Sequence, residues 1–357
     1  MASHTLQANR VKGSSSHDRV ETGSVNIAVA TFPVCDDVSV PALDALVIAQ
    51  EWLAGFLKCL HAHDYDTLLQ DLFVDNECYW RDHLALDWDF RTLHGADKIK
   101  EYLQQGTRGE QLVNVELDTS KPRSAPHAEA IDDKDAIHGV EVFLNLETKI
   151  GRGRGVVRLV KQKGHWKAFT LFTTLQELHG HEEPTGLRRP PGVQHGHNPL
   201  RKNWAERRKT EQDFEEQEPA VLVLGAGQAG LMIAARLKML GVPTLVIDKN
   251  ERVGDNWRQR YHQLVLHDPI WYDVMPYVPF PSHWPVFTPK DKLAEWFECY
   301  GKILELNIWT NTTLSNSTWD EASSKWTVEI SRKATSGSAQ TRTFHPSHVI
   351  LATGHSG

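Results

Sequence analysis

The sequence has few cysteines and no long apolar run. Its four cysteines, Cys35, Cys59, Cys78 and Cys299, lie at least 19 positions apart, so no Cys-x-x-Cys pair exists for zinc or redox chemistry. No stretch of about 18 apolar residues is present, and the polar, Ser-rich start lacks the apolar region of a secretory signal. These absences argue against a disulfide framework and a membrane span, and we expect a soluble, cytoplasmic protein.

An excess of positive charge is also missing. Lys and Arg number 39 against 46 Asp and Glu, which gives a formal net charge of −7 and predicts no basic face for nucleic acid. Hydrophobic residues make up 40% of the chain and charged residues 24%, as is typical of globular proteins. A length of 357 residues then predicts two domains with connecting and terminal segments.

Changes in composition along the chain predict four segments. Residues 1–38 are polar with few periodic apolar positions, which is typical of a flexible tail. In residues 39–178, stretches with helical spacing precede alternating ones, an order that predicts an α+β domain whose sheet curls around its helices. Residues 179–218, rich in proline, glycine and charge, predict a linker, and its last part, 204–218, has the pattern of a charged helix. The second domain then covers residues 219–357.

The clearest motif is a glycine turn between a predicted strand and a predicted helix. The apolar run AVLVL, from Ala220, leads into GAGQAG and then into LMIAARLKML. In this order Gly225 permits the tight turn, Gly227 lets the backbone approach a pyrophosphate, and Gly230 lets the helix pack against the strand. A second strand ends at Asp248, 23 residues after Gly225, near the spacing at which a carboxylate binds a ribose. The alternative is a turn without a ligand, but the full context favours dinucleotide binding, with phosphate at the helix N-terminus.

Residues 221–257 resemble the FAD-binding start of the flavin-containing monooxygenases, including the plant YUCCA-type enzymes and their fungal and bacterial relatives. That family carries a Gly-Gly-x-Trp-like element, where this chain has Gly-Asp-Asn-Trp at 254–257, so one glycine is missing. The aromatic and proline-rich segments 264–281 and 283–300 resemble the part of the family that closes over the flavin. HVILATG at 348–354 resembles the family's Ala-Thr-Gly element, although an ordinary buried strand with a glycine turn is the alternative.

The resemblance implies an α/β Rossmann-like FAD-binding domain, incomplete at its C-terminus, with FAD as cofactor. By the same resemblance, the cofactor-binding residues are Gly225, Gly227, Gln228, Ala229, Gly230, Asp248, Lys249, Arg252, Gly254, Trp257, Arg258, His267, Ala352, Thr353 and Gly354. NADPH is expected for the full-length family, but its second glycine fingerprint is not found in this sequence, which suggests a truncated chain. The cluster of glycines at 151–155 has another spacing and predicts a hairpin turn.

The front domain resembles the nuclear transport factor 2-like, or SnoaL-like, domain, whose cone holds catalytic His and Asp residues in some members. Asp82, His83 and Asp87 are therefore one candidate acid/base set. The favoured alternative is that Trp80, Arg81 and Asp82 are structural, with an arginine paired to a carboxylate near the sheet. Two His-x-His pairs in the linker are candidate zinc or nickel ligands, but without rigid support we interpret them as solvated and predict no metal site. The four residues are His179, His181, His195 and His197.

Taken with the resemblance, these motifs predict a flavoprotein oxidoreductase. The family's reaction is an NADPH-dependent oxygenation of a small organic substrate through a C4a-hydroperoxyflavin. The alternative is a non-catalytic binding or dimerisation protein built on the front domain, with a degenerate flavin domain and possible homodimers. Disulfide reductases and amine oxidases share the entry motif, but the missing Cys-x-x-x-x-Cys and the WPVF segment argue against both. No catalytic residue is predicted.

Overall fold

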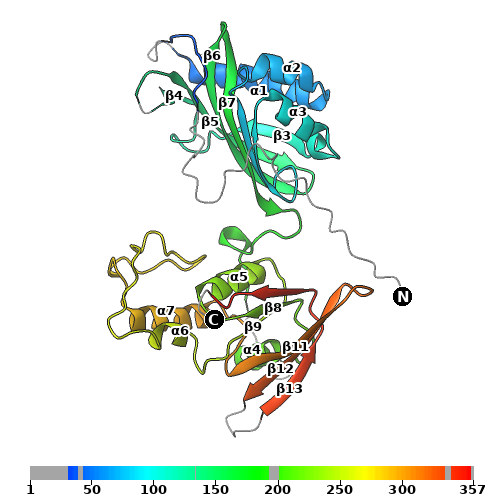
Figure 1. Cartoon of the computed structure of the whole chain (residues 1–357), viewed down its shortest axis with the longest axis vertical. Helices are drawn as coiled ribbons and strands as arrows, with labels where there is room; N and C mark the ends of the chain where they lie inside the picture. The colour runs from blue at the N-terminus through cyan, green and yellow to red at the C-terminus, as the bar shows by residue number, and fades with distance from the viewer. Residues whose placement is uncertain (1–30, 39–42, 133, 193–200, 334–338, 355–357) are drawn as a thin grey trace, which may run out of the picture. The chain divides into compact units, whose positions relative to one another are not determined.

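The structure is a computed structural model that describes residues 31–38, 43–132, 134–192, 201–333 and 339–354 (Figure 1). The chain forms two compact units, Met1–His179 and Gly180–Gly357, and each is described by itself. Within the described ranges, no helix combines the length and the apolar character needed to cross a bilayer.

Three helices of the first unit pack on one face of a curved sheet (Figure 1). They are α1 (Ala45–His61), α2 (Tyr65–Leu72) and α3 (Ala96–Gln104), followed by the short 3-10 helix η3 (Arg108–Glu110). Asp44 and Asp64 begin the first two helices, because each carboxylate accepts a hydrogen bond from a backbone N–H of the first turn. The apolar stripes recognised in the sequence form the buried faces of these helices.

The sheet of the first unit contains seven strands in the order β2-β1-β7-β6-β5-β3, with β4 paired to β5. The strands are β1 (Tyr79–His83), β2 (Phe90–His94), β3 (Leu112–Leu117), β4 (His127–Ala130), β5 (His138–Thr148), β6 (Gly151–Gln162) and β7 (His165–Leu178). All pairs are antiparallel except β1 with β7, which is parallel. The predicted helices and alternating strands are present, but their order differs because β1 and β2, which were not recognised from the sequence, lie between α2 and α3; β4 was also not recognised.

The prediction of a hairpin turn at the 151–155 glycines is wrong. Gly151, Gly153 and Gly155 lie inside β6, on the face that is buried. A Cβ added at Gly155 would lie 2.7 Å from the carbonyl oxygen of Phe172 on β7, and at the other two glycines it would overlap β7 carbonyls directly. The glycines are therefore required by the close approach of a neighbouring strand, at the period of two that strands impose.

Residues 31–38, expected to belong to a flexible tail, pack on the first unit. The N–H of Asp36 donates to the Lys161 carbonyl at 2.8 Å, and the Asp36 carboxylate accepts from the N–H of Gly164 at 2.7 Å. The ring of Phe32 lies 5.6 Å from that of Phe169 on β7. For these residues the tail prediction is corrected, because the segment supplies hydrogen bonds to the β6–β7 hairpin, while residues 1–30 lie outside the described ranges.

The second unit contains a four-stranded parallel sheet in the order β10-β9-β8-β14 and a three-stranded antiparallel sheet, β11-β12-β13. The parallel strands are β8 (Val221–Leu224), β9 (Thr244–Ile247), β10 (Ile308–Trp309) and β14 (His348–Leu351). The antiparallel strands are β11 (Thr312–Asp320), β12 (Lys325–Lys333) and β13 (Ala339–Phe344), and the helices are η4 (Gly186–Arg188), α4 (Trp204–Gln212), α5 (Gln228–Met239), α6 (Asp255–Arg258) and α7 (Lys290–Ile303). Alternate residues of β8 enter different apolar clusters, since Val221 and Val223 pack with α5 and α7 and Leu222 packs with β12 and β13.

The last part of the predicted linker belongs to the second unit. The helix predicted over 204–218 forms as α4 but ends at Gln212. Its Arg208 donates to the Leu306 carbonyl at 2.6 Å, and Phe214, just after it, is buried against the parallel sheet. Periodicity missed this attachment because α4 has almost no apolar face and is held by charged and polar contacts.

Candidate functional site

The glycine turn lies between β8 and α5, at the carboxyl end of the parallel sheet. Gly225 has φ +109°, a left-handed value that favours glycine, and its N–H donates to the Ile247 carbonyl at 2.8 Å. A Cβ at Gly225 would overlap the carbonyl oxygen of Ala352, which follows β14. The first glycine is thus required by the chain crossing next to it.

The other two glycines of the motif meet different surroundings. A Cβ at Gly230 would overlap the carbonyl oxygen of Gly225, so this glycine is required for the helix to start against the turn. Gly227 has an ordinary φ of −81°, and the described atom near an added Cβ is Nδ2 of Asn256, at 3.2 Å. The fold itself therefore has no strong need for glycine at position 227, whereas a pyrophosphate approaching the backbone would.

The helix behind this turn begins directly at the open glycine. Gly227 is the N-cap of α5, and the N–H of Leu231 already donates to its carbonyl at 2.9 Å. The N–H groups of Gln228 and Ala229, in the first turn, have no acceptor within the helix. Together with the helix dipole, these donors form a site suited to a phosphate group.

Asp248 closes the site from the end of β9. One carboxylate oxygen accepts the N–H of Ala226 in the glycine turn at 2.7 Å, and the other accepts the N–H of Asn250 at 2.8 Å. A carboxylate offers about four acceptor positions, so both oxygens retain capacity for ribose hydroxyls. The predicted neighbourhood of Asp248 and the glycines is therefore present in the fold, and the residues fit a dinucleotide.

The Gly-Asp-Asn-Trp element forms the turn into α6. Gly254 has φ +90°, and an added Cβ would lie 2.6 Å from the carbonyl oxygen of Ala294 on α7. Asp255, at the place of the family's second glycine, accepts the N–H of Arg252 at 3.0 Å and pairs with Arg258 at 2.9 Å. The negative charge that Asp255 brings in place of a glycine is thus balanced by Arg258 within the same turn.

The structure does not direct the two arginines of this element toward a free phosphate. Arg252 makes two contacts with the Glu298 carboxylate, at 2.8 and 3.0 Å, and the pKa of Glu298 is lowered chiefly by this hydrogen bond. Arg258 pairs with Asp255 and, at 3.3 Å, with Glu295. Both guanidinium groups are thus paired with carboxylates, several of them on α7, that the local sequence did not reveal, and their place near the cofactor stays a prediction.

The remaining predicted cofactor residues differ in how far they are exposed to solvent. The N–H of Ala352 donates to the Leu224 carbonyl at 2.8 Å, which places the Ala-Thr-Gly segment beside the glycine turn. Thr353 and Gly354 are exposed there, and Trp257 is half-buried against the α5–α7 cluster. Lys249 and His267 are exposed on loops. Asn256 borders the open face of Gly227, a position that the local sequence pattern did not predict.

The candidate acid/base set of the first unit is not assembled. Asp82 points into the core and is fully buried, whereas His83, the next residue of β1, lies on the opposite face, where its Nε2 accepts a hydrogen bond from Nε of Arg81 at 2.8 Å. Asp87 pairs with Arg108 at 2.5 Å, beside a pocket of about 400 Å³ whose lining includes neither Asp82 nor His83. Trp80 and Asp82 are buried in the core, as the structural alternative expected, but the arginine that pairs with a carboxylate here is Arg108, whereas Arg81 donates to His83 and Thr92.

The buried carboxyl of Asp82 accepts hydrogen bonds from the Thr173 hydroxyl at 2.6 Å and from the N–H of Leu86 at 3.1 Å. Burial nevertheless raises the pKa of Asp82 above its ordinary value of 3.8. Asp82 therefore binds more protons in the folded unit than in the unfolded chain between these two pKa values, and its contribution to the free energy of unfolding falls as pH rises through that window.

We expect this pH dependence to be measurable in the full chain by urea unfolding at several pH values from about 3 upward. Asp82→Asn removes the titrating group, so the stability of the wild type relative to this variant should decrease as pH rises. Below the ordinary aspartate pKa the difference should be constant. A relative stability that increases with pH would contradict a raised pKa.

The linker histidines are only partly described. His179 pairs with Glu147 at 3.1 Å and His181 is exposed, while His195 and His197 lie outside the described residues.

Comparison with known proteins supports the assignment of the glycine turn. Residues 223–283 match the family model of the NAD(P)-binding Rossmann-like domain. A probable indole-3-pyruvate monooxygenase, YUCCA10 of Arabidopsis thaliana, is 28% identical over 141 residues, which is 39% of this chain and 36% of the relative. An uncharacterized CzcO-like oxidoreductase of Geobacillus kaustophilus is 38% identical over 92 residues, 26% of each chain.

Among solved structures, a flavin-containing monooxygenase from Stenotrophomonas maltophilia matches 37% of both chains with 20% identity and a TM-score of 0.31. The chain spans little more than a third of the length of YUCCA10, of which it covers 36%. The second unit thus contains a segment that matches the NAD(P)-binding Rossmann-like family model and is similar to parts of an indole-3-pyruvate monooxygenase and a CzcO-like oxidoreductase.

Proposed function

We propose that the second unit binds FAD and that the chain acts as a flavin-dependent oxidoreductase of the monooxygenase type on a small organic substrate. The observation that carries this proposal is the open face of Gly227, between the start of α5 and the Asp248 carboxylate. The similarity to flavin monooxygenases supports FAD as the dinucleotide and NADPH as the reductant.

Each part of this site has a separate task in the proposal. The N–H groups of Gln228 and Ala229 hold the pyrophosphate, and Asp248 accepts the hydroxyls of the ribose. Gly225 and Gly230 keep the turn tight enough to present those groups. The bound flavin supplies the redox chemistry, and the protein orients it and restricts water.

The predicted cofactor residues that lie farther from the glycine turn have separate roles in this proposal. Arg252 and Arg258 act as positioning residues, because their ion pairs hold the Gly254 turn against α7. Ala352, Thr353 and Gly354 form the border of the site next to Gly225. These three, Trp257, Lys249 and His267 remain predicted flavin neighbours. For the first unit we propose a SnoaL-like, cone-shaped fold, and we assign it no activity.

The test is a titration of the purified full chain with FAD, followed by the visible spectrum and by identification of the cofactor released on denaturation. The expected result is one bound FAD per chain, recovered as intact FAD on denaturation. FMN or nicotinamide nucleotides alone serve as competitors. A protein that is folded by circular dichroism but binds no FAD would overturn the proposal.

A second candidate function is an interaction module, homodimers of the front domain included. The observation that favours it is exposed apolar surface on the second unit, where Leu351 of the outer strand β14 is 74% exposed and Tyr272 is 82% exposed. Light scattering and the visible spectrum of the chain after incubation with FAD and removal of the excess distinguish the two. A stable colourless dimer supports this second candidate, and a flavin-loaded monomer supports the first.

A further inference from the structure

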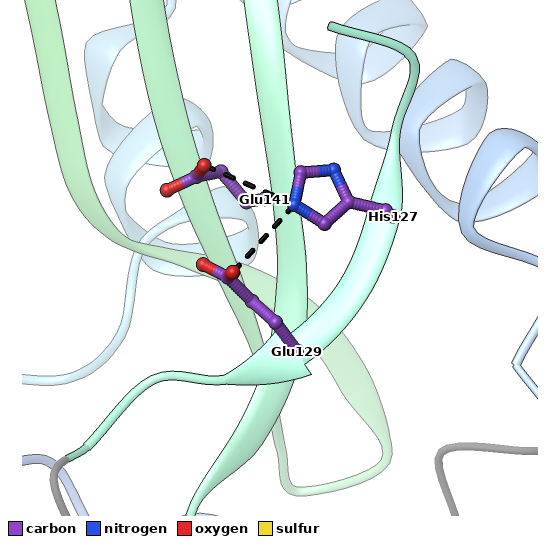
Figure 2. A group of neighbouring side chains, drawn as sticks. All are labelled: His127, Glu129 and Glu141. Carbon is purple, nitrogen blue, oxygen red and sulfur yellow. Dashed lines mark ion pairs between the residues drawn. The ribbon is translucent and has the colours of Figure 1, made fainter. Parts of the chain in front are cut away.

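Three potential metal ligands converge on one face of the β4–β5 pair, in the first unit. His127 on β4 lies directly opposite Glu141 on β5, and Glu129 is two residues farther along β4. Residues two apart on a strand share a face, so all three side chains project to the same side. Figure 2 shows the imidazole directed toward both carboxylates.

The distances between these groups fit a cation better than direct hydrogen bonds. Nε2 of His127 lies 3.6 Å from Oε2 of Glu129 and 4.0 Å from Oε1 of Glu141, beyond good hydrogen-bond length. One ligand atom from each residue falls within 4.8 Å of the others. A tetrahedral zinc ion with bonds of about 2.0–2.2 Å separates its ligand atoms by about 3.3–3.6 Å. Small rotations of the half-exposed His127 and Glu129 side chains close this difference.

The hydrogen bond of Nδ1 of His127 determines that Nε2 is the nitrogen available to bind a metal ion. Nδ1 of His127 lies 3.1 Å from the carbonyl oxygen of Ala125, which can only accept, so Nδ1 carries the proton. Nε2 then presents its lone pair to the carboxylates. A backbone carbonyl that holds the far N–H of a histidine is the usual support of a metal-ligating imidazole.

Glu141 is held by a similar outer contact. Nη2 of Arg158 on β6 pairs with Oε2 of Glu141 at 2.7 Å and leaves Oε1 toward His127. Among the described residues, no Lys or Arg pairs with Glu129. Two carboxylates and a neutral imidazole therefore face one another with a single arginine at the far side, an arrangement that a divalent cation stabilises.

We propose that His127, Glu129 and Glu141 bind one Zn²⁺ ion, with water at the fourth position. One nitrogen and two carboxylate oxygens form a ligand set that zinc accepts, and the exposed side of the strands leaves room for the water. The site lies in the first unit and is independent of the proposed flavin chemistry. The competing state is a doubly protonated His127 that bridges the two glutamates without metal.

The test is a titration of the tag-free full chain with Co²⁺, followed through its visible absorption, and then displacement by Zn²⁺. To separate this site from other histidines of the chain, the wild type is compared with His127→Gln, and with Glu129→Gln in case the first variant folds poorly. The control is His165→Gln, which removes an exposed histidine at the start of β7.

The expected result is one bound equivalent in the wild type and the control that is lost in His127→Gln, with an affinity at least about tenfold lower in Glu129→Gln. Zn²⁺ should also raise the unfolding temperature of the wild type but not of His127→Gln, because the ion binds the folded strand pair. Equal stoichiometry, spectra and thermal shifts in the wild type and both variants would overturn the proposal. Loss of all binding on His179→Gln/His181→Gln substitution would do the same.

Discussion

Gly227→Ala is expected to lower the affinity for FAD by at least about tenfold, or about 1.4 kcal/mol, while the second unit stays folded. The backbone at Gly227 has an ordinary φ, and the added methyl group meets only the end of the Asn256 side chain. The same methyl group would stand between the backbone and the pyrophosphate, at the position where the dinucleotide must approach most closely. The measurement is an FAD titration by fluorescence quenching, with far-ultraviolet circular dichroism as the check on folding.

The matched comparison is Gly230→Ala in the same motif. Its Cβ would overlap the carbonyl oxygen of Gly225, so this variant should disturb the strand–turn–helix itself and lose both FAD binding and thermal stability. The two alanines thus separate a requirement of the ligand from a requirement of the fold. Unchanged FAD affinity in a folded Gly227→Ala protein would place the cofactor elsewhere.

Trp80→Ala is expected to destabilise the first unit by about 3–5 kcal/mol, the usual cost of removing a large aromatic side chain from a core. Trp80 is fully buried, its ring stacks on Phe73 at 6.1 Å, and its Nε1 donates to the Thr173 hydroxyl at 2.9 Å. Truncation leaves a cavity and also removes a donor from the hydrogen-bond chain that continues to Asp82.

Urea unfolding of the full chain, followed by circular dichroism, measures this loss. The control is Trp88→Ala, because Trp88 is 66% exposed and its removal should change stability by less than about 0.5 kcal/mol. Equal effects of the two substitutions would contradict the burial of Trp80 in the core.

Local patterns predicted the nucleotide site better than they predicted its surroundings. The glycine turn and Asp248 could be predicted because the strand, turn, helix and next strand are formed by one continuous stretch of sequence with known spacing. The partners of Arg252 and Arg258 come from α7, about 40 residues later, and no spacing rule points to them. The glycines of β6 were misread for the same reason, since the carbonyls that require them belong to β7.

Some information in the sequence was overlooked rather than absent. The alternation of Trp80, Arg81, Asp82 and His83 is the period of a strand, and with β1 recognised it would have separated Asp82 from His83 in advance. His127 and Glu129 also alternate, but Glu141 joins them only through the pairing of β4 with β5. Cross-strand register is set by the whole sheet, so this cluster required the fold.

The contacts of residues 31–38 bear on how the first unit can be shortened for expression. A version that starts at the first helix would remove the Asp36 carboxylate from the β6–β7 hairpin and the Phe32 ring from Phe169. The N–H groups of Lys163 and Gly164 would then lose their acceptor and hydrogen-bond to water instead. The face of Phe169 that Phe32 covers would also become more exposed. A cloning boundary placed ahead of Thr31 keeps these contacts, and we expect the resulting protein to be more stable and to aggregate less than the shorter version.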